Sequence, residues 1–163
     1  MIISDSSPLI HLTRLGKINY LLKLKSPLFI PKAVYTEVIA AGKKENRIEA
    51  QIIEKLIEQG KIIVKPVKID DSFVPSLGQG EREALELANR EKLLLLVDDR
   101  KARNIAHHFE LQHQTTILTI LELLIAKMID LAEYKGNLKK YAEDSWVSAD
   151  IIQEFLEKGE KLG

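Results

Sequence analysis

The sequence contains no cysteine, which excludes disulfide bonds, cysteine-ligated zinc and thiol catalysis together. It also lacks an excess of charge of either sign, because 24 lysines and arginines balance 24 aspartates and glutamates. A nucleic-acid partner would therefore need a local basic patch. No apolar run approaches the roughly 20 residues that cross a bilayer, and the opening MIISDSSPLI lacks the basic start and cleavage site of a signal peptide. We therefore expect a cytoplasmic protein with no membrane contact.

The amino-acid composition is typical of a folded globular chain, with 45% hydrophobic and 29% charged residues. A length of 163 residues favours one domain with a sizeable core. We expect a single domain over residues 1–163, with a helical C-terminal extension from about 134.

Short apolar runs rich in β-branched residues predict strands over 1–4, 28–31, 62–64 and 93–97, and 115–118 is a candidate fifth strand. Helical spacing predicts helices between the strands and from 120 onward, with breaks near Gly136 and near 145–148. Strands that alternate with helices indicate an α/β fold. We expect a three-layer α/β/α sandwich with a mainly parallel central sheet of four to five strands. Ser6 and Ser7 are candidate caps of the first helix.

Acidic side chains accompany the strands of the predicted sheet. Asp5 follows the first strand directly, and Asp98 and Asp99 follow the fourth. Glu37 lies about two turns into the helix after the second strand, and Glu81 begins the helix before the fourth. Because ligands of open parallel sheets bind beyond the carboxyl ends of the strands, we expect all five acids to face one cleft.

Such a cluster suits a divalent cation. Mg²⁺ requires hard oxygen ligands and keeps several waters, and a cation relieves the repulsion among neighbouring carboxylates. A metal held in this way can activate a water and stabilise charge on a phosphate during in-line displacement. Each acid alone has an ordinary interpretation, as a helix cap, a first-turn acid or a solvated residue, and only their combined placement favours a site.

Basic side chains follow the fourth strand closely. Arg100, Lys101 and Arg103 are next to the expected metal site. They form either a solvated helix face or a set of contacts to phosphate groups.

Four segments resemble the PIN-domain family: IISDSSPLIHL, IPKAVYTEVIAAG, LGQGEREALELA and LLLLVDDRKARNIA. They resemble most the branch of uncharacterised prokaryotic PIN-like proteins, and the similarity runs across nearly the whole chain. The resemblance implies a ribonuclease that uses Mg²⁺ or Mn²⁺ to hydrolyse phosphodiester bonds in RNA. Such proteins are often the toxin of a toxin–antitoxin pair, which implies an antitoxin protein as a partner.

The resemblance also implies roles for individual residues. Asp5 and Glu37 match the first and second acids of the family, and Glu81 stands where the third begins its helix. The fourth acid falls on Asp98 or Asp99. The spacing from Glu81 in toxin-type members favours Asp99, whereas the branch nearest this sequence has its regular acid at Asp98. Asp5, Glu81, Asp98 and Asp99 would hold the metal directly or through water, with Glu37 assisting catalysis.

Two positions depart from the toxin-type pattern. Glu81 is longer than the usual aspartate, and Val97 provides no hydroxyl before the fourth acid. We therefore expect a different metal geometry. Ser7 stands where the family commonly places a small polar residue near the metal, and its alternative role is that of a helix cap only.

Two other functions compete with the nuclease. A catalytically degenerate PIN scaffold that binds only protein or nucleic acid is compatible with the unusual third acid. A phosphorylated receiver domain also gathers acids at strand ends, but it requires a pair of acids after the first strand and a phosphoacceptor aspartate after the third. Here the first strand ends in the single Asp5 and the third runs into 65–67, which places this alternative lower.

The helices after 118 carry apolar stripes that a chain of this size covers only in part. These stripes comprise Ile120, Leu121, Leu124, Ile125 and Met128, and then Ile151, Ile152, Phe155 and Leu156. Larger exposed apolar surfaces mark interfaces, and the PIN resemblance implies dimers. We therefore predict a homodimer, the alternative being that both stripes pack on the sheet. Trp146, Tyr141, Phe155 and Ile151 are interpreted as packing or partner contacts in preference to base-stacking residues.

Overall fold

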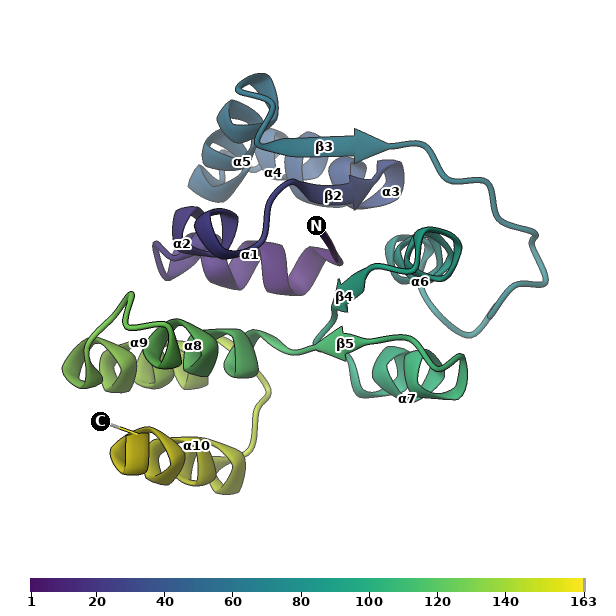
Figure 1. Ribbon diagram of the computed structural model, residues 1–163. Coiled ribbons are helices and arrows are strands. Elements are labelled where there is room, and N and C mark those ends of the chain that lie inside the picture. Colours follow the sequence, from purple (N-terminus) through teal and green to yellow (C-terminus); the bar gives the residue numbers. More distant parts are fainter. Residues whose placement is uncertain (163) are drawn as a thin grey trace.

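A five-stranded parallel sheet forms the centre of the computed structural model, which describes residues 1–162 (Figure 1). Its strands are β1 (Ile2–Ser4), β2 (Leu28–Pro31), β3 (Ile62–Lys65), β4 (Leu94–Leu96) and β5 (His113–Gln114). They lie in the order β3-β2-β1-β4-β5, and every neighbouring pair is parallel. In the register, Ile3 pairs with Phe29 on one side and with Leu95 on the other.

Helices connect the strands and cover both faces of the sheet. They are α1 (Ser6–Arg14), α2 (Ile18–Leu24), α3 (Lys32–Tyr35), the π-helical turn η1 (Thr36–Ala40), α4 (Ala41–Lys44), α5 (Ile48–Glu58), α6 (Gln79–Glu91), α7 (Arg100–His108), α8 (Thr116–Ile125), α9 (Leu131–Asp144) and α10 (Ala149–Leu162). Among the helices of residues 1–162, none combines the length and the apolar character that crossing a bilayer requires.

The side chains of each strand alternate between two apolar cores. Ile2 and Leu96 belong to the core that α1, α2 and the α3–α5 region cover, whereas Ile3 and Leu95 belong to the core beneath α6 and α7. Because both faces of the sheet are buried, the strands are continuous apolar runs, which is why the sequence revealed them. The predicted three-layer α/β/α sandwich with a mainly parallel sheet is confirmed.

A third apolar cluster lies among α8, α9 and α10, which pack together at the lower left of Figure 1. At its centre Tyr134 is fully buried, and its hydroxyl donates to the backbone oxygen of Phe155 at 2.6 Å. Gly159 lets α10 approach this ring, because a Cβ there would overlap the ring carbons of Tyr134.

Replacing Gly159 by alanine is expected to destabilise the protein by about 1–3 kcal/mol, because the buried Tyr134 ring has no room to move away. Chemical denaturation measures this cost. Gly136→Ala on α9 is the matched control, since a Cβ there meets nothing within 4 Å and should add slightly to helix stability. Equal stability of the two variants would contradict the packing argument.

The predicted strand over 115–118 is wrong, because the chain enters a helix there. β5 ends at Gln114, and the Oγ1 of Thr115 accepts from the N–H of Leu118 at 3.3 Å as the cap of α8. A threonine is both a good strand residue and a good helix cap, so the local sequence fits either structure.

The predicted break near Gly136 is also wrong, since α9 runs through it. A single glycine costs a helix only about 1 kcal/mol, and tertiary packing outweighs that. The chain breaks earlier, between Ile125 and Leu131, where the Oδ1 of Asp130 accepts from the N–H of Glu133 and caps α9. The predicted break near 145–148 is confirmed.

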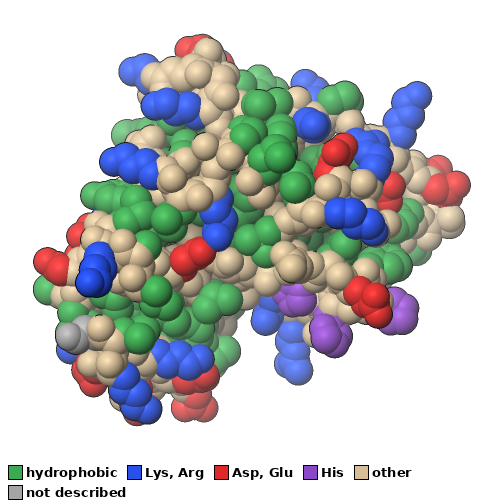
Figure 2. Space-filling model, in the orientation of Figure 1, with side chains coloured by type: hydrophobic (Ala, Val, Ile, Leu, Met, Phe, Trp, Pro, Cys, Tyr) green, Lys and Arg blue, Asp and Glu red, His purple; other side chains and the backbone are tan. Residues whose placement is uncertain are grey.

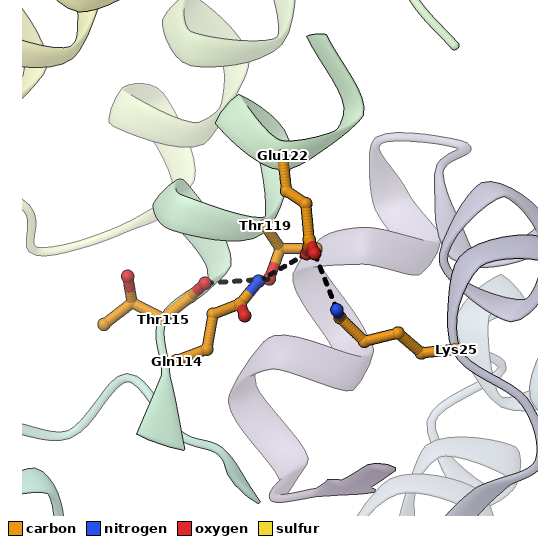
Figure 3. Close-up of polar contacts among 5 residues, drawn as sticks. All are labelled: Lys25, Gln114, Thr115, Thr119 and Glu122. Atoms are coloured by element: carbon orange, nitrogen blue, oxygen red, sulfur yellow. Dashed lines mark hydrogen bonds and ion pairs between the residues drawn. The ribbon is translucent and has the colours of Figure 1, made fainter. Parts of the chain in front are cut away.

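Polar contacts join the corner between β5 and α8 to helix α2 (Figure 3). The Nε2 of Gln114 donates to Thr119 Oγ1 and to Glu122 Oε2, each at 2.9 Å. The Nζ of Lys25, the residue just after α2, donates to the other oxygen of Glu122 at 2.6 Å. Thr119 Oγ1 in turn donates to the backbone oxygen of Thr115. This network fixes the N-terminus of α8 relative to the sheet edge.

Most of the apolar stripe on α8 and α10 is buried within the chain. Ile120, Leu121, Leu124 and Phe155 all lie in the third cluster, whereas Ile125 is 58% and Ile151 39% exposed. Figure 2 shows hydrophobic side chains that remain at the surface over this region. The surface that motivated a homodimer is therefore smaller than expected, and the homodimer stays a prediction.

Candidate active site

The carboxyl ends of β1 and β4 open into a cleft of about 1200 Å³. Four of the five acids singled out in the sequence line it, namely Asp5, Glu81, Asp98 and Asp99. The fifth, Glu37, lies beside the cleft and does not line it. The parallel topology explains this gathering, since it brings the ends of separate strands to one edge of the sheet.

Asp5 is the most buried of these acids, with 4% of its surface exposed. Its backbone N–H donates to the carbonyl of the last residue of β4 at 3.0 Å, so the sheet itself holds Asp5 in place. Burial raises the pKa of Asp5 to about 7, because it removes water from the charged form. A hydrogen bond from the Ser6 backbone lowers this pKa, and the nearby charges of Glu81, Glu37 and Asp98 raise it.

Glu37 lies on the π-helical turn and reaches across to α6. Its Oε1 accepts from the N–H of Gly80 at 3.1 Å, and its Oε2 accepts from the hydroxyl of Ser6 at 2.5 Å. A Cβ at residue 80 would lie 2.7 Å from both carboxylate oxygens, so any side chain there would push Glu37 away. The π-helical turn changes the direction of the side chains on this helix, a feature that is frequent at functional sites.

Glu81 stands in the first turn of α6, where its Oε2 accepts from the N–H of Gly78 at 3.1 Å. Burial is the main cause that raises the pKa of Glu81, and the charges of Asp99 and Glu37 act in the same direction. The hydrogen bond from Gly78 and the charge of Lys101 lower it. Glu81 therefore belongs to the same electrostatic cluster as Asp5.

Asp98 and Asp99 have different surroundings although they are adjacent. Asp98 accepts from the N–H and the hydroxyl of Thr116, each at 2.7 Å, and from the Ser7 hydroxyl at 3.3 Å. Both of its oxygens are thus engaged in joining α8 and α1 to the end of β4. Asp99 is more exposed and uses Oδ2 to cap α7 through the N–H of Ala102 at 2.8 Å. Within residues 1–162, its Oδ1 accepts no hydrogen bond.

Ser6 and Ser7 do not cap α1, which corrects the sequence interpretation. The cap position is Asp5, and its side chain makes no capping hydrogen bond. The two hydroxyls instead donate to Glu37 and Asp98, which hold acids that are far away in the sequence. Both serines lie inside the first turn of the helix, one and two residues past the cap position, so their hydroxyls are not placed to cap it and instead donate to charged acceptors.

A family model described as a PIN domain matches residues 1–161 of this chain. The chain belongs to the PIN-domain family. Among solved structures, a PilT N-terminus domain protein from the hyperthermophilic archaeon Sulfolobus solfataricus P2 is similar, with 18% identity and a TM-score of 0.49. That similarity covers 80% of this chain and 96% of the other. No curated protein matches the chain.

PIN domains are generally nucleases that bind divalent metals, so the donor set of this PIN domain can be tested against such an ion. Within residues 1–162, no three of the histidine and acidic side chains form a group that could hold a metal unaided. Mg²⁺ is commonly held by one or two carboxylates, with waters and substrate phosphates as the other ligands. The crowded carboxylates around Asp5 fit such a hydrated Mg²⁺ or Mn²⁺, because a cation would relieve their repulsion.

Of the basic residues expected to contact nucleic acid, Arg100 and Arg103 line the cleft of this PIN domain and Lys101 does not. Lys101 donates instead to the backbone oxygen of Ser76 at 3.4 Å. The Nε of Arg103 is buried and has no hydrogen-bond partner within residues 1–162. A buried N–H without an acceptor is costly, so Arg103 is suited to an anionic oxygen from a ligand.

Two residues of the GEREAL segment escaped the sequence analysis. Glu83 is 7% exposed, and its Oε2 accepts from the N–H of Ala33 at 2.7 Å. This hydrogen bond caps α3, the helix that leads to the turn bearing Glu37. Arg82 donates to the backbone oxygens of Phe73 and Asp70 and so fastens the 66–78 segment. A signal for Glu83 existed, because it lies beside apolar residues on the inward side of α6, where a carboxylate requires a partner.

Proposed function

We propose that this PIN domain is a ribonuclease that uses Mg²⁺ or Mn²⁺ to hydrolyse phosphodiester bonds in RNA. The observation that carries the proposal is Asp5, a buried carboxylate whose pKa is raised to about 7 on the wall of a cleft that Glu81, Asp98 and Asp99 also line. Keeping a carboxylate so desolvated and so close to other acids is unfavourable in the absence of a cation. These acids therefore favour a nuclease over a scaffold that only binds partners.

In this proposal the acids have distinct roles. Asp5, Glu81 and Asp99 hold the cation directly or through water, and Asp98 combines that task with fixing α8 and α1. The bound cation would polarise a water and stabilise the charge that develops on the phosphate. Glu37 orients the reacting water, because Gly80 and Ser6 hold its carboxylate in one position beside the cleft. Arg103 binds a phosphate oxygen of the substrate.

The direct test is cleavage of a labelled RNA by the purified protein. We expect cleavage in Mn²⁺ or Mg²⁺ and none in EDTA, together with saturable Mn²⁺ binding in a calorimetric titration. Binding of RNA without cleavage in either metal would instead support the degenerate scaffold. A cognate antitoxin and a cytoplasmic location remain predictions.

Replacing Arg103 by methionine is expected to weaken RNA binding about equally for all sequences, and to reduce the slope of log affinity against log salt by about one. Methionine keeps an apolar stem but removes the charge and the unpartnered Nε. Fluorescence anisotropy at several salt concentrations measures both quantities. Arg90→Met is the control, because Arg90 lies outside the cleft and is exposed. An unchanged salt slope in the Arg103 variant would remove this residue from the phosphate contacts.

A further inference from the structure

Trp146 is the single tryptophan of the sequence, and its side chain is fully exposed at 104%. It lies in the turn between α9 and α10, where the hydroxyl of Ser145 accepts from the N–H of Val147 and that of Ser148 accepts from the N–H of Ile151. Val147 packs in the third apolar cluster. The adjacent Trp146 takes no part in this cluster and projects outward. The turn therefore presents the indole ring to solvent. Of the two roles expected from the sequence, packing within the chain is wrong, and a partner contact stays a prediction.

The ring emerges at the cleft that holds the acids, since Trp146 lines the same cavity as Asp5 and Asp99. The cleft also contains four arginines; Arg14 and Arg47 are paired with Glu49 and Glu45, whereas Arg100 and Arg103 form no ion pair within residues 1–162. Tryptophan is highly buried on average, and an indole in water forgoes the gain of apolar burial. An exposed ring beside cations is therefore a surface that gains when a ligand with a flat apolar face and negative charge binds.

A nucleic-acid strand has both properties. Its phosphates match the arginines, and an unpaired base offers a face on which an indole can stack. A base inside a duplex is already stacked on its neighbours, so Trp146 gains nothing from it without unpairing. A protein partner would also cover the ring, but Arg100 and Arg103, which form no ion pair within residues 1–162, favour a phosphate backbone over an apolar protein surface.

We propose that Trp146 is a base-stacking residue, which binds one unpaired base of the strand whose backbone lies in the acidic cleft. This inference rests on the proposed function, because the cleft is assigned to nucleic acid. It adds a contact in the turn between α9 and α10 to the acids that the sheet edge and α6 hold. Because every base has a stacking face, this contact sets affinity and the position of the strand, not the sequence that is bound.

The tryptophan supplies its own signal for the test. The intact protein is titrated in EDTA, where cleavage is not expected, with a short single-stranded RNA, its DNA equivalent and a blunt RNA duplex. Binding is followed by the anisotropy of a label on the oligonucleotide and by the fluorescence of Trp146. We expect both single strands to quench the tryptophan at the concentrations at which the anisotropy rises. The duplex should quench it much less.

Three variants separate stacking from other roles of the side chain. Trp146→Ala is expected to lower the affinity for single strands roughly 5- to 150-fold, whereas Trp146→Phe, which keeps a ring, should remain within about fivefold of wild type. Ile125→Ala is the control, because it removes an exposed apolar side chain outside the cleft. Unchanged thermal unfolding of Trp146→Ala would show that the fold is intact, as its full exposure leads us to expect.

The outcomes distinguish this inference from the function on which it rests. If no oligonucleotide raises the anisotropy with any variant, the nucleic-acid function itself is wrong, and the inference falls with it. If single strands bind wild type and Trp146→Ala equally, without quenching, the cleft binds nucleic acid and the stacking role is overturned. A shift in Trp146 fluorescence that depends only on protein concentration would assign the ring to a contact between chains and would likewise overturn it.

Discussion

Asp5→Asn is expected to stabilise the metal-free protein at pH 8 by about 2–4 kcal/mol, and to abolish its metal-dependent cleavage of RNA. The pKa of Asp5 is raised from 3.8 to about 7 in the folded protein. Above pH 7 the folded protein must keep this carboxylate charged at full cost, and below pH 3.8 the group is protonated in both states. The contribution of Asp5 to stability therefore becomes less favourable as the pH rises from about 4 to 7. Asparagine carries no charge, so the gain should appear at pH 8 and vanish near pH 4.

Chemical denaturation in EDTA at the two pH values measures the gain, and cleavage in Mn²⁺ measures the loss. Asp71→Asn is the matched control, because Asp71 is an exposed carboxyl in the 66–78 segment. It should change the free energy of unfolding by no more than about 0.5 kcal/mol and the rate of cleavage by no more than a small factor. Wild-type cleavage by Asp5→Asn would refute the proposed function. An equal gain in stability at pH 4 and pH 8 would refute the electrostatic cause.

Gly80→Ala is expected to slow cleavage about 10- to 100-fold with little change in stability. The new Cβ would lie 2.7 Å from both oxygens of Glu37, whose exposed end can swing away cheaply. The displaced carboxylate then loses its bonds to Gly80 and Ser6 and its position beside the cleft. A displacement of about 1 Å from a productive geometry can cost about 100-fold in rate. Single-turnover cleavage measures the effect.

A double-mutant cycle identifies Glu37 as the cause. In the background of Glu37→Ala, the additional Gly80→Ala change should slow cleavage no further, because the carboxylate that it displaces is already absent. Gly136→Ala on α9 is the control for adding a methyl group to a helical glycine, and it should leave cleavage unchanged. Additive effects of the two substitutions would mean that residue 80 acts on catalysis by another route.

The sequence predicted best those features whose cause is local. The strands are short apolar runs because both faces of the sheet are buried, and Asp5, Asp98 and Asp99 are found at their ends because parallel strands end at one edge. The placement of Glu81 in the first turn of α6 was equally local. That these acids bind Mg²⁺ or Mn²⁺ stays a prediction, which the experiments on cleavage and metal binding test.

The features that escaped the sequence depend on partners far away along the chain. Ser6 bonds to a glutamate 31 residues later, and Glu83 caps a helix 50 residues earlier. No spacing pattern marks such pairs. The π-helical turn around Glu37 likewise has no sequence signal, since Thr36–Ala40 is compatible with an ordinary helix. The distinction between Asp98 and Asp99 was open for the same reason, because it depends on Thr116 in one case and on the start of α7 in the other.

The first turn of α6 has a consequence for how the length of this chain can vary. Gly80 touches Glu37, Glu81 faces the cleft, Arg82 fastens the preceding segment and Glu83 caps α3. These four consecutive residues thus contact four different parts of the structure. Inserting or deleting one residue within 80–83 would rotate the following side chains by about 100° around the helix axis and disrupt these contacts together. The 66–78 segment just before it is anchored on the second core by Val67, Phe73, Val74 and Leu77, so only its exposed residues around 70–72 carry no such constraint on length. Natural or engineered insertions in this PIN domain are therefore expected to collect around residues 70–72 and to be absent from Phe73 onward, where the fixed geometry begins.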